Sequence, residues 1–144
     1  MANKVKRREV VRRQRATQAT KSKFENKSMA WEREVTCVHL ARFHLAKMGH
    51  KLPKMPRVKS LLGAKKALKE NGWKDTAAML DSFLEPIPPA AMRMGDVAVM
   101  QDDSGMGAVV ISLGMGWSKV MGWHEDVEGL AVMDVKEFIG AWRG

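Results

Sequence analysis

The chain has 144 residues and a formal net charge of +9, and 45% of its residues are hydrophobic. A chain of this size and composition can bury one hydrophobic core, which excludes an intrinsically disordered protein. No apolar run approaches the roughly 18 residues of a membrane span, and a single cysteine excludes an internal disulfide. The sequence therefore predicts one globular domain that folds without oxidising conditions.

The positive charge is concentrated at the N-terminus. Residues 1–28 hold ten basic and two acidic residues, a net charge of +8, whereas residues 29–144 carry a net charge of only +1. We therefore expect a basic N-terminal arm over residues 1–28 and a nearly neutral domain over residues 29–144. The candidate partner-binding residues of the arm are its arginines, Arg7, Arg8, Arg12, Arg13 and Arg15.

The first half of the domain has the periodicity of helices. Apolar residues three and four positions apart predict helices over residues 29–48, 58–71 and 75–84. Three prolines within four positions then prevent regular structure in the segment 85–96.

Beyond residue 96 the apolar pattern becomes that of strands. The predicted strands lie within residues 96–101, 107–114, 117–123 and 129–134. Asp134 and Glu137 resemble a capping box, which predicts a short last helix over residues 135–144. Helices followed by consecutive strands are typical of an α+β fold with an antiparallel sheet.

Cys37 is the candidate nucleophile, since it lies at a predicted helix start. The positive end of a helix dipole lowers the pKa of a thiol, and a histidine can then accept its proton. The alternative is a small buried residue without chemistry, a common environment for a free cysteine.

Helix geometry restricts the candidate bases. His39 points about 200° away around the helix from Cys37, and His44 lies about 10 Å further along the axis. His50 follows the end of the helix, so His124 stays as the candidate base, which could reach Cys37 only through the fold. His39 and His44 also lack the spacing that places two ligands on one helix face, so we expect no metal site and no cofactor.

Several short motifs follow one another in order over residues 29–144. They are a tryptophan and Thr36-Cys37 at a helix start, "MGDVAVM", "GAVVISLGMGW" and a closing "AWRG". This ordered set resembles the NlpC-type branch of the papain-like cell-wall peptidases. It is most similar to a phage and prophage branch of that superfamily, often encoded near tail-tip genes. The resemblance implies a papain-like α+β fold, with N-terminal helices packed on a small antiparallel sheet.

The resemblance also implies a site and shows that it is incomplete. It places the nucleophile at Cys37, preceded here by Thr36 where active enzymes have an aspartate. It places the histidine base at position 108, which is Ala108 in this chain, and the third polar member near Trp117 or Lys119. Because loss of the base lowers the rate by several orders of magnitude, we expect the fold without peptidase activity.

These expectations together favour a structural protein of a tailed phage, at the tail tip or distal tail. It would be assembled in the host cytoplasm, reside in the virion and bind other tail proteins. One alternative is a cysteine peptidase or amidase acting on peptidoglycan during phage entry, with Cys37 as nucleophile and His124 as displaced base. A second alternative is a nucleic-acid-binding accessory protein that uses residues 1–28 to contact phosphates.

Overall fold

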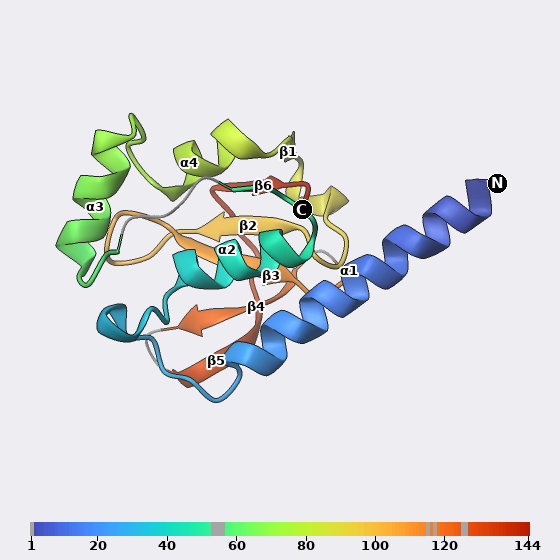
Figure 1. Ribbon diagram of the computed structural model, residues 1–144, viewed down its shortest axis with the longest axis horizontal. Coiled ribbons are helices and arrows are strands. Elements are labelled where there is room, and N and C mark those ends of the chain that lie inside the picture. Colours follow the sequence, from blue (N-terminus) through green and yellow to red (C-terminus); the bar gives the residue numbers. More distant parts are fainter. Residues whose placement is uncertain (1, 53–56, 115, 117, 125–126) are drawn as a thin grey trace.

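Helices come first along the chain and strands follow, as the computed structural model shows (Figure 1). The structure describes residues 2–52, 57–114, 116, 118–124 and 127–144. The helices in this part of the chain are α1 (Ala2–Phe24), α2 (Cys37–Lys47), α3 (Leu61–Glu70) and α4 (Thr76–Phe83), with short 3₁₀ turns η1 (Trp31–Arg33) and η2 (Pro89–Ala91). No helix among the described residues is both long enough and apolar enough to cross a membrane.

Side-chain caps determine where three of the helices begin. The side chains of Thr36, Ser60 and Asp75 each accept a hydrogen bond from the backbone N–H three residues ahead. The helix predicted over residues 29–48 was therefore too long at its N-terminal end. Its first part instead contains η1 and an isolated antiparallel bridge between Ala30 and Val35.

The strands form one antiparallel sheet. Its strands are β1 (Pro86–Ile87), β2 (Val97–Met100), β3 (Ala108–Ser112), β4 (Lys119–His124), β5 (Val127–Asp134) and β6 (Gly140–Trp142). Within the described residues they lie in the order β1-β6-β2-β3-β4-β5, and every neighbouring pair is antiparallel. The predicted α+β class with an antiparallel sheet is confirmed, and β2 to β5 lie where the sequence placed strands, although Trp117 is outside the described residues.

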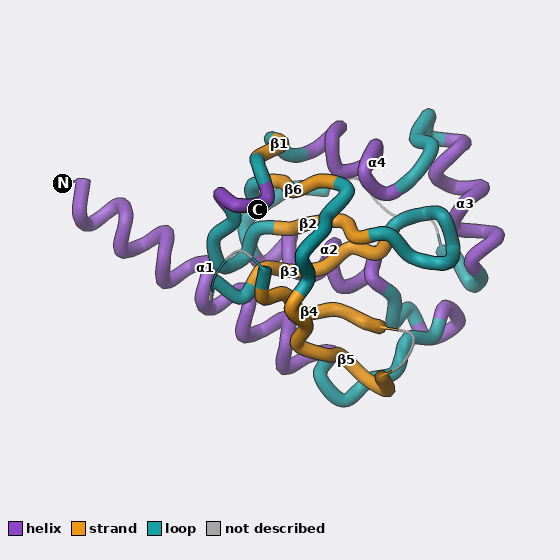
Figure 2. Tube along the Cα trace, turned by 180° about the vertical axis from the view of Figure 1, so that it is seen from behind, coloured by secondary structure: helices purple, strands orange, loops and turns teal. Residues whose placement is uncertain are grey.

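The predicted last helix over residues 135–144 is wrong. Residues 135–139 instead run across the back of the sheet, and residues 140–142 form β6 (Figure 2). The reason is distance, because β6 lies four strand positions from β5, or about 19 Å at the usual strand spacing. Five extended residues span roughly 17 Å, whereas five helical residues span only about 7.5 Å.

The two faces of the sheet are covered differently. Helices α1 and α2 lie on one face of the sheet (Figure 1). On this face Leu40 and Leu45 belong to one buried cluster with alternate residues of β2 and β3. On the other face, Phe138 and Met92 pack against the opposite set of strand residues, including Val110. Strand β3 is consequently buried along its whole length, which explains its continuous β-branched sequence.

Helix α1 has two unlike halves. Its N-terminal end projects beyond the body of the molecule in both the ribbon and the tube view (Figures 1 and 2). Its C-terminal half is packed, and Phe24 is 2% exposed, with its ring edge-to-face against Phe43 and Trp123. Residues 13–24 therefore share the core of the rest of the chain, although they lie within the predicted arm.

Candidate functional site

Cys37 is the first residue of α2 and belongs to the cluster of core side chains beneath that helix. The Thr36 hydroxyl caps the helix by accepting a hydrogen bond from the backbone N–H of His39 at 3.3 Å. Cys37 itself is only 8% exposed. The sequence was therefore right to place this cysteine at a helix N-terminus, and the fold directs it toward the sheet.

Burial determines the ionisation of Cys37. Loss of solvent raises the pKa of its thiol from 9.0 to about 11. A hydrogen bond from the backbone at Val109 opposes this increase, and the negative charge of Asp102 adds to it. The expected lowering of the thiol pKa by the helix dipole is therefore outweighed, and Cys37 is a neutral thiol at pH 7.

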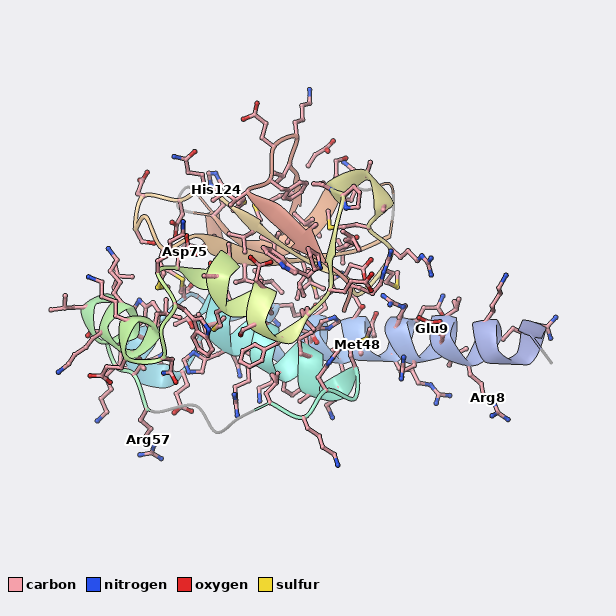
Figure 3. The ribbon with its side chains drawn as sticks, turned by 90° about the horizontal axis from the view of Figure 1, so that it is seen from above. Arg8, Glu9, Met48, Arg57, Asp75 and His124 are labelled. Carbon is pink, nitrogen blue, oxygen red and sulfur yellow. The ribbon has the colours of Figure 1, made fainter. Side chains whose placement is uncertain are left out.

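A pocket of about 480 Å³ lies above the thiol. It is lined by Cys37, by Ala108 at the start of β3 and by His124 at the end of β4. Figure 3 shows His124 at the end of the molecule remote from the projecting part of α1. The remaining lining residues are Ser28, Met29, Met100, Gln101, Asp102, Asp103, Trp123, Glu128 and Gly129.

The pocket contains acidic groups that the sequence analysis did not select. The Asp102 carboxylate accepts hydrogen bonds from the Ser104 hydroxyl at 2.8 and 2.9 Å and from the backbone N–H of Gly107 at 3.1 Å. The sequence showed only a turn here, "DDSG", which is the structural role these bonds give Asp102. Ala108, where the resemblance expects a base, lines the pocket with a side chain that cannot accept a proton.

The helical histidines have structural contacts. His39 lies 2.7 Å from the Thr36 hydroxyl through its Nδ1. His44 is fully buried, and its Nε2 donates to the carbonyl of Gly95 at 2.8 Å. Burial lowers the pKa of His44, so its ring is neutral at pH 7. The geometric argument that excluded both residues as bases for Cys37 agrees with these contacts.

A buried ionic cluster occupies the other end of the same strands. Asp96, which is 0% exposed, precedes β2 and accepts from Arg13 Nη1 at 2.8 Å and Arg143 Nη1 at 2.6 Å. It also accepts from the backbone N–H groups of Arg93 at 2.7 Å and Gly144 at 2.9 Å. We call this group the Asp96 cluster. Its partners are far apart in the sequence, so no local spacing could have indicated it.

The five arginines proposed as partner-binding residues fall into two groups. Arg13 is 4% exposed and is bonded inside the Asp96 cluster, so it is removed from the partner-binding set. The other four are exposed on α1. With Lys47 of α2 they line a groove of about 580 Å³, whose lining residues are Arg7, Arg8, Val11, Arg12, Arg15, Ala16, Ala19 and Lys47.

The fold and the pocket define an α+β domain with a neutral cysteine at the N-terminus of a core helix, facing an antiparallel sheet. Within the described residues, no group of three or more His, Cys, Asp or Glu side chains could hold a metal ion. A family model described as Domain of unknown function (DUF6950) matches residues 8–144, and the chain belongs to that family. No curated protein and no solved structure matches the chain. The matched region includes most of α1 as well as the domain behind it.

Proposed function

We propose that this chain is a non-catalytic structural component of a phage tail, built on a papain-like domain of the NlpC type. One observation carries the proposal: the neutral thiol of Cys37 lines the same pocket as Ala108, whose side chain contains no proton acceptor. A papain-like enzyme needs a thiolate and a histidine at these two places. Position 37 keeps the cysteine of the nucleophile, whereas position 108 has no proton acceptor. This combination is expected of a domain that acts through its structure and not through catalysis.

The projecting half of α1 supports a docking role. Arg7, Arg8 and Arg12 are exposed there, Arg15 is exposed at the start of the packed half, and Arg13 anchors the helix to the body of the molecule through Asp96. A helix held rigidly at one end and exposed at the other is suited to contact a neighbouring tail protein. The tail tip or distal tail is the location that the family resemblance favours.

The test is complementation of the phage or prophage that encodes the chain. Deletion of the gene should leave tails incomplete, and both the wild-type chain and Cys37→Ala should restore complete, infectious particles that contain the protein. Particles that assemble with Cys37→Ala but cannot enter the host would refute the non-catalytic role. Particles that lack the protein altogether would refute the structural role.

A cysteine hydrolase is the second candidate, because Cys37, His124 and Asp102 line one pocket. In that reaction the thiol would lose its proton to His124 and attack an amide carbonyl of peptidoglycan, and His124 would give the proton to the departing amine as the C–N bond breaks. Water would then hydrolyse the resulting thioester and restore the thiol. Purified protein incubated with muropeptides distinguishes the two candidates. Release of fragments by the wild-type chain, abolished in both Cys37→Ala and His124→Ala, would establish the hydrolase; equal and negligible release by all three chains supports the structural role.

A further inference from the structure

The groove on α1 combines positive charge with an apolar floor. Arg7, Arg8, Arg12 and Arg15 line it from α1 and Lys47 lines it from α2. Figure 3 shows Arg8 on the part of α1 that extends beyond the body of the molecule. Small and apolar side chains lie between these cations, namely Val11, Ala16 and Ala19. Of the residues that the structure describes, none that lines the groove is acidic.

The cations of this groove have no acidic partners within the described part of the chain. Glu9, the acidic residue of α1, is paired with Arg13 at 3.3 Å. Arg8 and Arg12 are four residues apart and repel each other on the helix surface. The first turn of α1 also has no acidic residue to favour the positive end of the helix dipole. An acidic partner would therefore stabilise this half of α1 as well as bind to it.

The apolar floor indicates the kind of acidic partner. Val11 is 41% exposed, a large apolar side chain open to solvent in the middle of a cationic surface. Ala19 is partly exposed and presents only a methyl group, which lets a second helix approach closely, whereas Ala16 is 3% exposed. Phosphates of a nucleic acid would satisfy the arginines but would leave Val11 uncovered. An amphipathic helix would satisfy both features of the groove.

We infer that this groove binds an acidic amphipathic helix of a protein partner. Glutamates or aspartates one turn apart on that helix would pair with Arg8, Arg12 and Arg15, and its apolar stripe would cover Val11 and Ala19. This inference rests on the proposed function in one respect, that the projecting part of α1 docks a protein, and it specifies the chemistry of the partner.

The experiment measures binding of fluorescent probes to the full chain by anisotropy. The first probe is a synthetic amphipathic helix of leucine, alanine and glutamate, and the second is a scrambled peptide of the same composition. The third is a duplex DNA of arbitrary sequence. We expect the amphipathic peptide to bind at least about tenfold more tightly than the scrambled one, which corresponds to about 1.4 kcal/mol.

Two variants distinguish the contribution of the arginine charges to binding from that of the apolar floor. Val11→Gln should weaken the amphipathic peptide severalfold and leave DNA binding unchanged. Arg8→Gln/Arg12→Gln/Arg15→Gln should remove binding of both probes, because glutamine keeps the helix propensity of arginine but not its charge. Lys65→Gln/Lys66→Gln/Lys69→Gln on α3 is the matched control and should bind the peptide as the wild-type chain does. Circular dichroism confirms that each variant keeps its helices.

Equal affinity for the amphipathic and scrambled peptides would overturn the inference. The inference would also be overturned if DNA bound more tightly than the peptide, with an affinity that falls steeply with salt and does not change in Val11→Gln. That result would show that the groove binds polyanions in general. Neither result would affect the proposed tail role, which complementation tests separately. Complete tails formed by the triple glutamine variant would likewise refute the groove as a tail contact while leaving the structural role in place.

Discussion

Strands β2 and β3 carry a buried polar site at each end, and the two sites differ in what surrounds them. Asp96 precedes β2, whereas Ala108 begins β3 opposite Met100, the last residue of β2. Asp96 is surrounded by two guanidinium groups and two backbone N–H groups. Cys37, which lines one pocket with Ala108, has a pKa raised by burial.

The difference shows what a buried ionisable group requires. A buried charge persists only when opposite charges and hydrogen-bond donors replace the lost water, as they do around Asp96. Ala108 supplies neither a charge nor a hydrogen-bond donor to replace the water that Cys37 has lost. The thiol of Cys37 therefore stays protonated. The first site therefore joins α1 to the C-terminal strand, and the second lacks the charge that nucleophilic catalysis needs.

The largest expected effect comes from breaking the Asp96 cluster. Asp96→Asn leaves buried Arg13 with only the partly exposed carboxylate of Glu9 at 3.3 Å, so the free energy of unfolding should fall by about 3–5 kcal/mol. Urea unfolding at pH 7 measures the change. Asp103→Asn, at an exposed carboxylate, is the control and should change stability little. A loss of less than about 1 kcal/mol on Asp96→Asn would mean that hydrogen bonding, and not charge, holds the cluster.

The Cys37 site should appear as a loss of stability at alkaline pH. The pKa of its thiol is about 11 in the folded chain and 9.0 ordinarily, so folding is favoured by the bound proton below pH 9. This contribution, roughly 2–3 kcal/mol, should disappear as the pH rises from 9 to 11. Unfolding of the wild-type chain and Cys37→Ala across this range isolates it, and no tyrosine titrates nearby. Parallel pH profiles would contradict a buried thiol.

The two sites also differ in how far the sequence could predict them. Local signals predicted a helix that contains Cys37 and the β2 to β5 strands, because apolar periodicity acts over a few residues. The N-caps Thr36, Ser60 and Asp75 were not predicted. The Asp96 cluster joins residues 13, 96 and 143, and β6 pairs with β2 only after crossing the whole sheet. Burial of Cys37 depends on the same packing, so the direction of its pKa shift could not be read from the helix alone.

Ala108→His would give the Cys37 site the histidine that a papain-like enzyme has at this position. An imidazole beside the thiol should lower the pKa of Cys37 by about one unit or more, since its protonated form stabilises the thiolate. The rate of iodoacetamide alkylation at pH 8 should then rise about tenfold. Ala108→Gln, polar but without a base, is the matched control and should alkylate slowly. Equal rates in both variants would refute the papain-like relation between positions 37 and 108.

The smallest expected effect concerns the cap that holds Cys37 in place. Thr36→Ala removes the hydroxyl that accepts from the backbone N–H of His39, so the free energy of unfolding should fall by about 1 kcal/mol. The loss is local, because the first turn of α2 would fray and expose the thiol. Alkylation of Cys37 should therefore accelerate at concentrations of urea far below the unfolding transition.

Ser60→Ala makes this distinction sharp, since Ser60 caps α3 in the same way, through Gly63 at 3.0 Å. It should reduce stability by a similar amount and leave the alkylation rate unchanged. If both cap variants accelerate alkylation equally, Cys37 becomes exposed only through unfolding of the whole domain. The Cys37 end of β2 and β3 would then resist local unfolding as well as the Asp96 end does. The two sites would differ only in that Asp96 is charged and Cys37 is not.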